Sequence, residues 1–405
     1  MIADKLRIEQ LLKQYGSPLY VFREKDFIDN YHSFDNAMKS GYDKYQLSYS
    51  YKTNYAPYIA SLVKKLGGYA EVVSDMEYYV AKKVGYEDKQ IIYNGPIKGD
   101  LSIRMMLNGG LLNVDNLDEL DRICKVAELS KDKQINVGLR VNINIGQKFI
   151  SRFGIDSDSE DLEKAIKMVD SYENLNIWGI HCHVGQSRTV ESWHNRAEVV
   201  LDIVKRYFPD KKLKYIDLGS GMFARMDESL AKQFGDDIPS FEDYANAVGS
   251  VFNEYYKDYT YEDKPILFTE PGTTLINSYI DFYSTVSSIK HIKGKEFVVL
   301  DCSKHNLGEI CTLKKMPLSV IHTGNHTEKL NDANFVGYTC LEHDVMYTGF
   351  NGDLAVGDYV VFGNVGGYSN VSKPPFISPN CAIISENGNI IKDKEEFEDI
   401  LRTYR

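Results

Sequence analysis

This sequence of 405 residues lacks a long apolar run. A membrane-spanning helix needs roughly 20 consecutive apolar residues, so we expect no membrane partner. Basic residues are also in the minority, because 47 Lys and Arg stand against 58 Asp and Glu, for a formal net charge of −11. A broad phosphate-binding surface needs clustered Lys and Arg, so we expect no nucleic-acid partner either.

Cysteine is scarce, and its six residues at positions 124, 182, 302, 311, 340 and 381 show no paired spacing. In a chain of this length, such cysteines are typical of reduced thiols and predict a cytoplasmic protein. The chain contains no internal repeat and no Pro/Gly-rich linker, and its length suits two domains.

The sequence does contain a regular alternation of short β-rich runs and amphipathic helical stretches between residues 46 and 270. The expected strands are Gln46–Tyr51, Tyr69–Val73, Ile91–Asn94, Leu111–Val114, Asn136–Asn142, Ile177–Val184, Tyr215–Gly219 and Ile266–Glu270. Such alternation predicts a parallel sheet, and eight units of about 30 residues suit a (β/α)8 barrel of the TIM type. A doubly wound open sheet is the alternative.

Chemically interesting residues favour the barrel, because each falls at or just past the end of one expected strand. They are Lys52, Ser74, Asn94, Asp115, Arg140, His183, Gly219 and Glu270. Active sites of these barrels are built at the C-terminal strand ends. This position therefore predicts an active site formed by these loops.

After about residue 280, strand-like runs follow one another without long helices. These runs are Tyr279–Val286, Phe297–Leu300 and Tyr359–Phe362. Asn387-Gly388 is typical of a hairpin turn. We predict a barrel domain over residues 24–280 and a β domain that combines residues 1–23 with 281–405. The apolar run Pro18–Phe22 is expected to return and join the β domain.

Lys52 and Glu270 are the first candidates for chemistry. Lys52 ends a strand at the expected barrel mouth, and a buried amine loses proton affinity, as Schiff-base chemistry requires. The alternative is a loop lysine paired with a carboxylate. Glu270 ends the eighth strand in Glu270-Pro271-Gly272. It suits holding a bound pyridine ring protonated on its nitrogen, or it caps the following loop.

Two further segments suit cofactor binding. The small residues of Asp217–Met222 let backbone N–H groups approach a phosphate, although tight turns need glycine in any case. His181 and His183 alternate onto one face of a strand. There an imidazole can stack on a flat cofactor, or two imidazoles can ligate a metal. No Cys or Asp set with metal-ligand spacing accompanies them, so we predict no metal.

Cys340 lies beside Glu342, His343 and Asp344 in the expected β domain. Most lone cysteines are small core residues. Ionisable neighbours in a loop instead suit a cysteine that does acid–base work, which makes Cys340 a candidate proton donor.

In this order, these segments resemble the fold-type III pyridoxal-phosphate (PLP) decarboxylases, which include ornithine, diaminopimelate and carboxynorspermidine decarboxylases. Further matching segments are Glu71-Val72-Val73-Ser74 with Glu77, Asn94-Gly95-Pro96, Arg140-Val141-Asn142, Ser151–Ile155 and Gly366-Gly367-Tyr368. The resemblance implies an alanine racemase-like two-domain fold, PLP as cofactor, and removal of the α-carboxylate of a small-molecule amino acid. It also implies a homodimer whose active sites are shared across the interface.

The resemblance implies a role for each site residue. Lys52 would carry the cofactor, His183 would stack on its ring and Glu270 would pair with its ring nitrogen. Cys340 would reach over from the partner chain and return a proton to the substrate. Further cofactor contacts are implied for Arg140, Ser187, Gly219, Ser220, Gly221, Gly272, Thr273 and Tyr368, and substrate contacts for Glu342, Asp344 and Tyr368.

Three positions depart from the family pattern. Thr273 stands where many members have an arginine that contacts the phosphate. Leu341 stands where ornithine and diaminopimelate decarboxylases have an acidic residue, and Asp301–Leu307 lacks the glycine and downstream arginine usual in diaminopimelate decarboxylases. The substrate stays open between diaminopimelate-, ornithine- and carboxynorspermidine-like molecules and a modified or carrier-linked amino acid.

Three other functions stay open. An amino-acid racemase of similar fold usually places an arginine at the ring nitrogen, where this sequence has Glu270. A catalytically inactive regulatory paralogue would fit Thr273. A metal hydrolase on a barrel would use His181 and His183.

Overall fold

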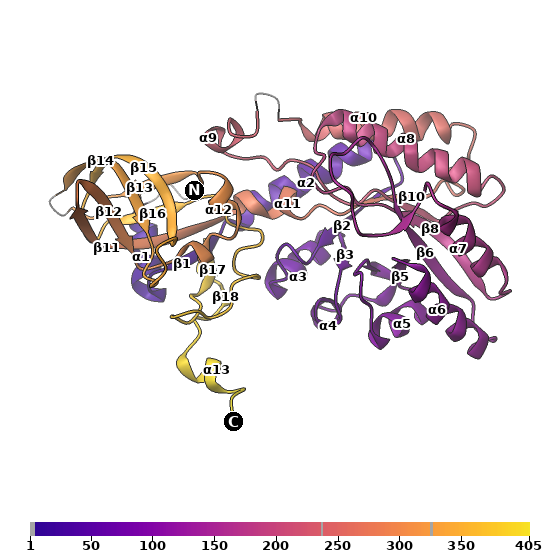
Figure 1. The fold of residues 1–405 in the computed structure, drawn as a ribbon, viewed down its shortest axis with the longest axis horizontal. Coiled ribbons are helices and arrows are strands. Elements are labelled where there is room, and N and C mark those ends of the chain that lie inside the picture. Colours follow the sequence, from indigo (N-terminus) through magenta and orange to yellow (C-terminus); the bar gives the residue numbers. More distant parts are fainter. Residues whose placement is uncertain (1–4, 236–237, 325–326) are drawn as a thin grey trace. The chain divides into compact units, whose positions relative to one another are not determined.

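The computed structural model describes residues 5–235, 238–324 and 327–405, which form two compact units. The barrel unit comprises Tyr31–Phe223 and Pro239–Gly272. The β-rich unit comprises Met1–Asn30, Ala224–Ile238 and Thr273–Arg405. Segments from both ends of the chain thus share the β-rich unit (Figure 1). The domain limits near residues 24 and 280 stay a prediction.

Eight parallel strands close into a barrel. They are β2 (Tyr45–Ser50), β3 (Tyr69–Val72), β4 (Ile91–Tyr93), β5 (Leu111–Val114), β6 (Ile135–Asn142), β8 (Leu175–His181), β9 (Tyr215–Asp217) and β10 (Ile266–Thr269). Their order is β5-β4-β3-β2-β10-β9-β8-β6, and β5 pairs with β6 to close the ring. The short strand β7 (Ile155–Asp156) pairs with β6. The predicted barrel is confirmed, but β8 ends at His181, so His183 lies in a loop.

Amphipathic helices connect the strands and turn an apolar stripe inward. They are α3 (Pro57–Lys65), α4 (Asp75–Lys83), α5 (Asp100–Leu107), α6 (Leu117–Leu129), α7 (Glu160–Asp170), α8 (Val190–Tyr207) and α10 (Phe241–Tyr255), with the 3-10 turn η1 (Asp88–Gln90). The helix α2 (Glu24–Gly41) runs from one unit into the other. The Thr189 side chain caps α8 by accepting from the Ser192 N–H. Helices α8 and α10 pack side by side (Figure 1).

Apolar and aromatic side chains fill the barrel interior. Tyr215 and Phe268 belong to one core cluster, with their ring centroids 6.0 Å apart. Gly138 in β6 and Gly179 in β8 make room for Tyr215: a Cβ at Gly138 would meet its hydroxyl, and a Cβ at Gly179 would meet its ring. The two glycines pair where the register of β6 and β8 shifts. A tyrosine is thereby held in the middle of the barrel.

The β-rich unit is built on a nine-stranded sheet. Its strands are β1 (Leu19–Phe22), β11 (Ile280–Ile292), β12 (Lys295–Leu300), β13 (Leu318–Ile321), β14 (Glu328–Val336), β15 (Val345–Leu354), β16 (Tyr359–Phe362), β17 (Ile383–Ser385) and β18 (Ile390–Lys392). Strand β1 pairs antiparallel with β11 and parallel with β17, which confirms that the early apolar run returns to this sheet. The hairpin of β17 and β18 turns at Gly388, where φ is +88°.

Most helices of the β-rich unit are short. They are α9 (Glu228–Ala231), α11 (Thr273–Ile276), η2 (Asn277–Tyr279), η3 (Lys304–Asn306), α12 (Ile310–Leu313) and α13 (Phe397–Leu401). The longer helix α1 (Lys5–Tyr15) packs Ile8, Leu11 and Leu12 into the core beside β1. Among all the described residues, no helix has the length and apolar character that a membrane span needs.

Candidate active site

Reactive side chains of the barrel unit gather at the carboxyl ends of its strands, where barrel active sites lie. These residues are Lys52 just after β2, Glu71 in β3, Asn94 after β4, Arg140 in β6, His181 at the end of β8, Asp217 at the end of β9 and Glu270 after β10. All of them except Lys52 are buried. The barrel thus holds several ionisable groups out of water at one end.

Lys52 is paired with a buried carboxylate. Its Nζ lies 2.7 Å from Oε2 of Glu71, which also accepts from the Ser50 hydroxyl at 2.6 Å. Glu71 is fully buried, whereas about 30% of the Lys52 side chain is exposed. Nearby, burial raises the pKa of the Glu77 carboxyl to about 7. The lysine is therefore held by a buried carboxylate of the barrel while part of its side chain stays exposed.

His183 is held as a neutral imidazole. Burial lowers its pKa well below the ordinary value, and the charge of Lys52 adds to this shift. Its Nδ1 accepts from the Ser220 N–H at 3.1 Å, so the ring proton sits on Nε2. About a quarter of the side chain is exposed. A flat, neutral ring is thus fixed at the strand ends with part of its surface accessible.

The loop after β9 has glycine at positions 219 and 221, where no side chain covers the backbone. Gly219 and Gly221 have φ of +67° and +111°, which favour glycine. A Cβ at Gly219 would lie 2.5 Å from the Cys182 carbonyl oxygen, and one at Gly221 would lie 2.8 Å from the Val184 carbonyl oxygen. The loop therefore packs directly on the segment that follows β8 and tolerates no side chain at either position.

Helix α8 braces this loop from behind. The Arg196 guanidinium donates to the carbonyl oxygens of Leu218 and Ser220, both at 2.7 Å, and of Val184 at 2.8 Å. Trp193 donates from Nε1 to the Gly221 carbonyl at 3.2 Å. Two side chains of one helix thus hold the carbonyl groups of the loop.

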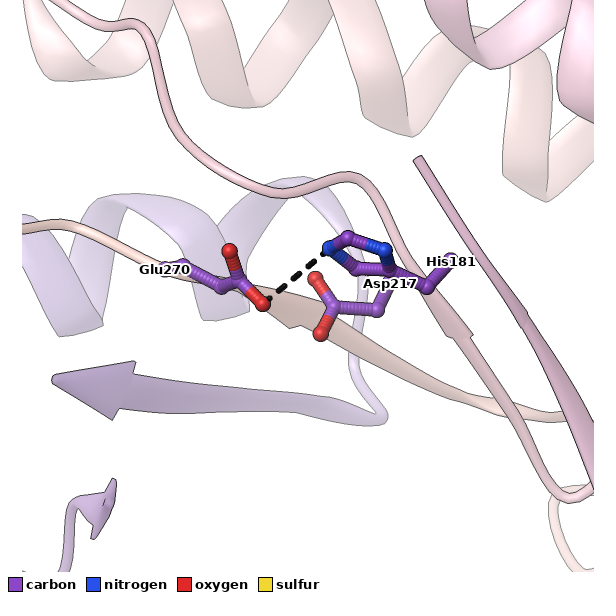
Figure 2. A group of neighbouring side chains, drawn as sticks. All are labelled: His181, Asp217 and Glu270. Carbon is purple, nitrogen blue, oxygen red and sulfur yellow. Dashed lines mark ion pairs between the residues drawn. The ribbon is translucent and has the colours of Figure 1, made fainter. Parts of the chain in front are cut away.

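His181, Asp217 and Glu270 converge from three strand ends (Figure 2). His181 Nε2 lies 3.3 Å from Glu270 Oε1, and all three residues are buried. Burial raises the pKa of the Asp217 carboxyl well above the ordinary range, and the neighbouring Glu270 raises it further. Burial also raises the pKa of Glu270 overall, but less far than that of Asp217, because the charge of Lys52 and the hydrogen bond with Asp217 offset part of the shift. Asp217 therefore keeps the proton and Glu270 is the carboxylate.

A proton on Asp217, shared with Glu270, is one way to satisfy the buried carboxyl oxygens of this cluster. Asp217 Oδ2 is fully buried and has no donor among the described groups, and a proton on this carboxyl, donated to Glu270, satisfies it. Burial lowers the pKa of His181 well below the ordinary value, and the charge of Arg140 contributes. The three groups are close enough to one another to ligate a metal, and the absence of a metal stays a prediction.

A chain of hydrogen bonds reaches Glu270 from the opposite side. Tyr215 donates to Asn113 Oδ1 at 2.7 Å, Asn113 Nδ2 donates to Asn94 Oδ1 at 2.7 Å, and Asn94 Nδ2 donates to Glu270 Oε1. Every residue of this chain is at most 3% exposed. All the donors point toward Glu270, which is the arrangement that an ionised carboxylate needs.

Comparison with known proteins agrees with this geometry. The protein family described as "Pyridoxal-dependent decarboxylase, pyridoxal binding domain" matches residues 25–277. The chain belongs to that family. It is similar to the diaminopimelate decarboxylases of Methanocaldococcus jannaschii and Bacillus subtilis, each 26% identical with 97% of this chain and 92% of the relative covered.

Solved structures agree with the sequence relatives. The crystal structure of diaminopimelate decarboxylase from M. jannaschii matches with a TM-score of 0.86 and 25% identity, covering 98% of this chain and 94% of that one. Its co-complex with L-lysine matches over the same shares with a TM-score of 0.84. This chain is thus a PLP-dependent amino-acid decarboxylase with a small-molecule substrate, as predicted. The racemase and inactive-paralogue alternatives gain no support from these relatives.

Five predicted site residues of this decarboxylase belong to the β-rich unit, namely Thr273, which is described below, and Cys340, Glu342, Asp344 and Tyr368. Cys340 is exposed, and so is Glu342. Asp344 is only 2% exposed, and its carboxylate accepts from the Lys304 N–H at 2.8 Å and from the Thr339 hydroxyl at 2.6 Å. Tyr368 is 43% exposed and has a φ of +55°. Asp344 thus organises the loop that presents the side chains of Cys340 and Glu342.

The remaining predicted residues of the decarboxylase differ in their surroundings. Arg140 donates to the Asn94 carbonyl oxygen and to Asp115. Ser187 lies in the loop between β8 and α8, and Thr273 begins α11. A Cβ at Gly272 would meet the Thr53 hydroxyl. Their predicted contacts with the cofactor stay predictions.

Sequence reasoning missed several residues that support this site. Arg196 is a charged residue on the apolar stripe of α8, beside Trp193, Ala197 and Val200. The sequence does offer one signal for Arg196: a charged residue stands at a position that the helical spacing predicts to be buried. The chain from Tyr215 to Asn94 offered no comparable signal, because its members become neighbours only when the barrel closes.

Proposed function

We propose that this decarboxylase removes the α-carboxylate of a diamino acid of the diaminopimelate class, with Lys52 as the residue that carries PLP. The observation that carries the proposal is the 2.7 Å contact of Lys52 Nζ with buried Glu71 at the barrel end. An oriented amine there suits condensation with a carbonyl group. The substrate class is proposed because relatives named diaminopimelate decarboxylase match almost the full chain.

The residues of the barrel unit fit PLP. The Gly219–Gly221 backbone, where a Cβ would collide, suits close approach of a phosphate. His183 offers a neutral ring for stacking, and Glu270 offers a buried acceptor for the ring nitrogen. When bound, PLP supplies an electron sink for the electron pair that the departing carboxylate leaves on Cα.

The β-rich unit would supply the proton. Cys340 is exposed in a loop that Asp344 organises, so its thiol suits delivery of a proton to Cα of the substrate. The neighbouring Glu342 is exposed and would meet a cationic distal group. Asp344 would act through the loop, because both of its oxygens already accept hydrogen bonds there.

The homodimer with shared active sites is proposed from the family resemblance and from the exposure of Cys340 and Tyr368. A cytoplasmic location is proposed from the six free cysteines, which are typical of a reducing compartment.

The test combines a substrate panel with cofactor trapping. We expect CO2 release from a carboxyl-labelled diaminopimelate isomer, with weaker release from ornithine, lysine and carboxynorspermidine. Borohydride reduction followed by peptide mass spectrometry should find the cofactor on the peptide that contains Lys52. Lys52→Ala should abolish both signals.

The matched control is Lys290→Ala, which removes an exposed lysine on β11 and should change neither signal. A cofactor adduct on another lysine would contradict the role of Lys52. CO2 release only from a substrate outside the diamino acids would contradict the substrate class and leave the role of Lys52 standing.

A further inference from the structure

Arg196 is a fully buried cation that forms no ion pair with any residue that the structure describes. Its Nη atoms donate only to the three backbone carbonyl groups of Val184, Leu218 and Ser220, and its Nε has no acceptor among the described groups. Within the part of the chain that the structure describes, the guanidinium forms no ion pair with a carboxylate within 4 Å, although the charge of Glu270 acts on it and raises its pKa. The Trp193 ring lies 4.2 Å below it. Among the described groups, its hydrogen-bond and ring partners are thus carbonyl dipoles and one aromatic face, while the ionisable groups of Cys182, Glu270 and Tyr244 also act on the charge.

Such an arrangement is costly by itself. A charge taken out of water needs a counter-charge, and carbonyl dipoles offset only part of the loss of hydration. Burial accordingly lowers the pKa of Arg196 to about 10. A buried guanidinium in these surroundings is stabilised when an anion binds nearby, so the position of the loop relative to Arg196 matters.

The loop is oriented to place an anion on its far side. Arg196 holds the Ser220 carbonyl, and Trp193 holds the Gly221 carbonyl. Because a trans peptide directs its N–H opposite to its C=O, the N–H group of Gly221 points away from α8. Backbone N–H groups presented in this way by a turn bind anions. Arg196 stands directly behind that turn.

We propose that Arg196 is the buried counter-charge for the phosphate of the cofactor. It acts through the Gly219–Gly221 loop as a positioning residue and supplies a positive charge, whereas the residue that follows Glu-Pro-Gly is the neutral Thr273. The inference rests on the proposed function, which assigns the phosphate to this loop. It explains how the enzyme retains an attractive site for a phosphate monoester although a neutral hydroxyl follows Glu-Pro-Gly.

The test compares binding of PLP with binding of pyridoxal, which lacks the phosphate, to the apoprotein. Arg196→Gln keeps hydrogen-bond donors but removes the charge, whereas Arg196→Lys keeps the charge. We expect R196Q to lose between about tenfold and a hundredfold of the preference for PLP over pyridoxal, the size of a charge-assisted interaction. R196K should keep most of that preference. The control R206Q removes an exposed arginine from the same helix and should change nothing.

Equal losses in R196Q and R196K would overturn the inference, because bracing of the loop rather than charge would then explain them. Full preference in R196Q would overturn it as well. A second measurement does not depend on whether R196Q folds. Inorganic phosphate should raise the thermal midpoint of the wild-type and R196K apoproteins. No such rise in the wild type would overturn the inference.

A separate variant tests the proposed function beneath it. Gly221→Ala places a Cβ 2.8 Å from the Val184 carbonyl oxygen at a φ of +111°, and it should deform the loop. If Gly221→Ala keeps the preference for PLP over pyridoxal, the loop is not the phosphate site and that part of the proposed function fails. If Gly221→Ala loses the preference while R196Q keeps it, only the role of Arg196 fails.

Discussion

At the residue scale, Glu270 receives hydrogen bonds from two sides of the barrel. Asn94 donates from the loop after β4, and protonated Asp217 donates from the end of β9. Both interactions favour the ionised form of Glu270, because a carboxylate only accepts hydrogen bonds. A ring nitrogen placed against Glu270 would therefore be favoured in its protonated form.

Asp217 should make folding of the apoprotein depend on pH. Its pKa is raised by burial and by Glu270 in the folded state, while the unfolded value is about 3.9. At a pH between these two pKa values, folding takes up a proton. The contribution of Asp217 to stability is therefore fully present below the unfolded pKa and is lost as pH rises toward and through the folded pKa. We expect the denaturation midpoint of Asp217→Asn to fall less steeply with rising pH than that of the wild type above about pH 4, by at most the equivalent of one proton.

Asp358 in the β-rich unit provides a control of opposite sign. Burial acts to raise its pKa, but hydrogen bonds from the N–H groups of Thr323 and Ala355 lower it overall. Asp358→Asn should therefore change the pH dependence only on the acid side of the unfolded pKa. Parallel curves for Asp217→Asn and the wild type would show that Asp217 is ionised in the fold.

At the scale of elements, the pairing of β6 with β8 depends on the space around Tyr215. Gly138 and Gly179 face its hydroxyl and its ring, respectively. The same tyrosine starts the hydrogen-bond chain that ends on Glu270. Tyr215 thus contributes both to the packing of β6 against β8 and to the hydrogen bonds that stabilise Glu270.

Gly179→Ala should destabilise the protein by about 3 kcal/mol, the upper range for overpacking a core. The cost arises because the added Cβ would meet the Tyr215 ring. In a Tyr215→Leu background the same glycine substitution should cost much less, since the ring is gone. Urea denaturation of the four proteins of this cycle measures the coupling. Additive effects of the two substitutions would show that the collision is relieved in some other way.

The elements and many site residues could be predicted from the sequence, for a physical reason. Each barrel strand is a buried run bounded by turns, so its own residues report it, and Lys52 and Glu270 follow such runs directly. Arg196 could not be assigned a role, because its acceptors are backbone carbonyl groups that carry no sequence signal. His183 was expected on a strand, but the strand ends before it at His181.

At the scale of the whole molecule, the proposed chemistry draws on two units, with Lys52 in the barrel unit and Cys340 in the β-rich unit. The proposed homodimer predicts complementation between two inactive variants. Lys52→Ala mixed with Cys340→Ala, after dissociation and reassembly, should recover about a quarter of wild-type activity. Half of the dimers are then mixed, and each mixed dimer holds one intact site.

The control for this experiment mixes Lys52→Ala with a variant that carries both substitutions, and it should recover nothing. Recovery in the control would indicate incomplete inactivation. Lack of recovery in the test mixture, with mixed dimers detected by mass, would mean that each subunit uses its own cysteine.

The path of the chain through the β-rich unit has a consequence for synthesis on the ribosome. Strand β1 is made early, but its partners β11 and β17 begin at Ile280 and Ile383. At about 5–20 residues per second, β1 waits roughly 15 to 50 s for its first partner. During that time four apolar residues that are buried in the finished protein form an open strand edge. Nascent chains stalled before Ile280 should therefore be the ones that chaperones hold and that aggregate when chaperones are withdrawn.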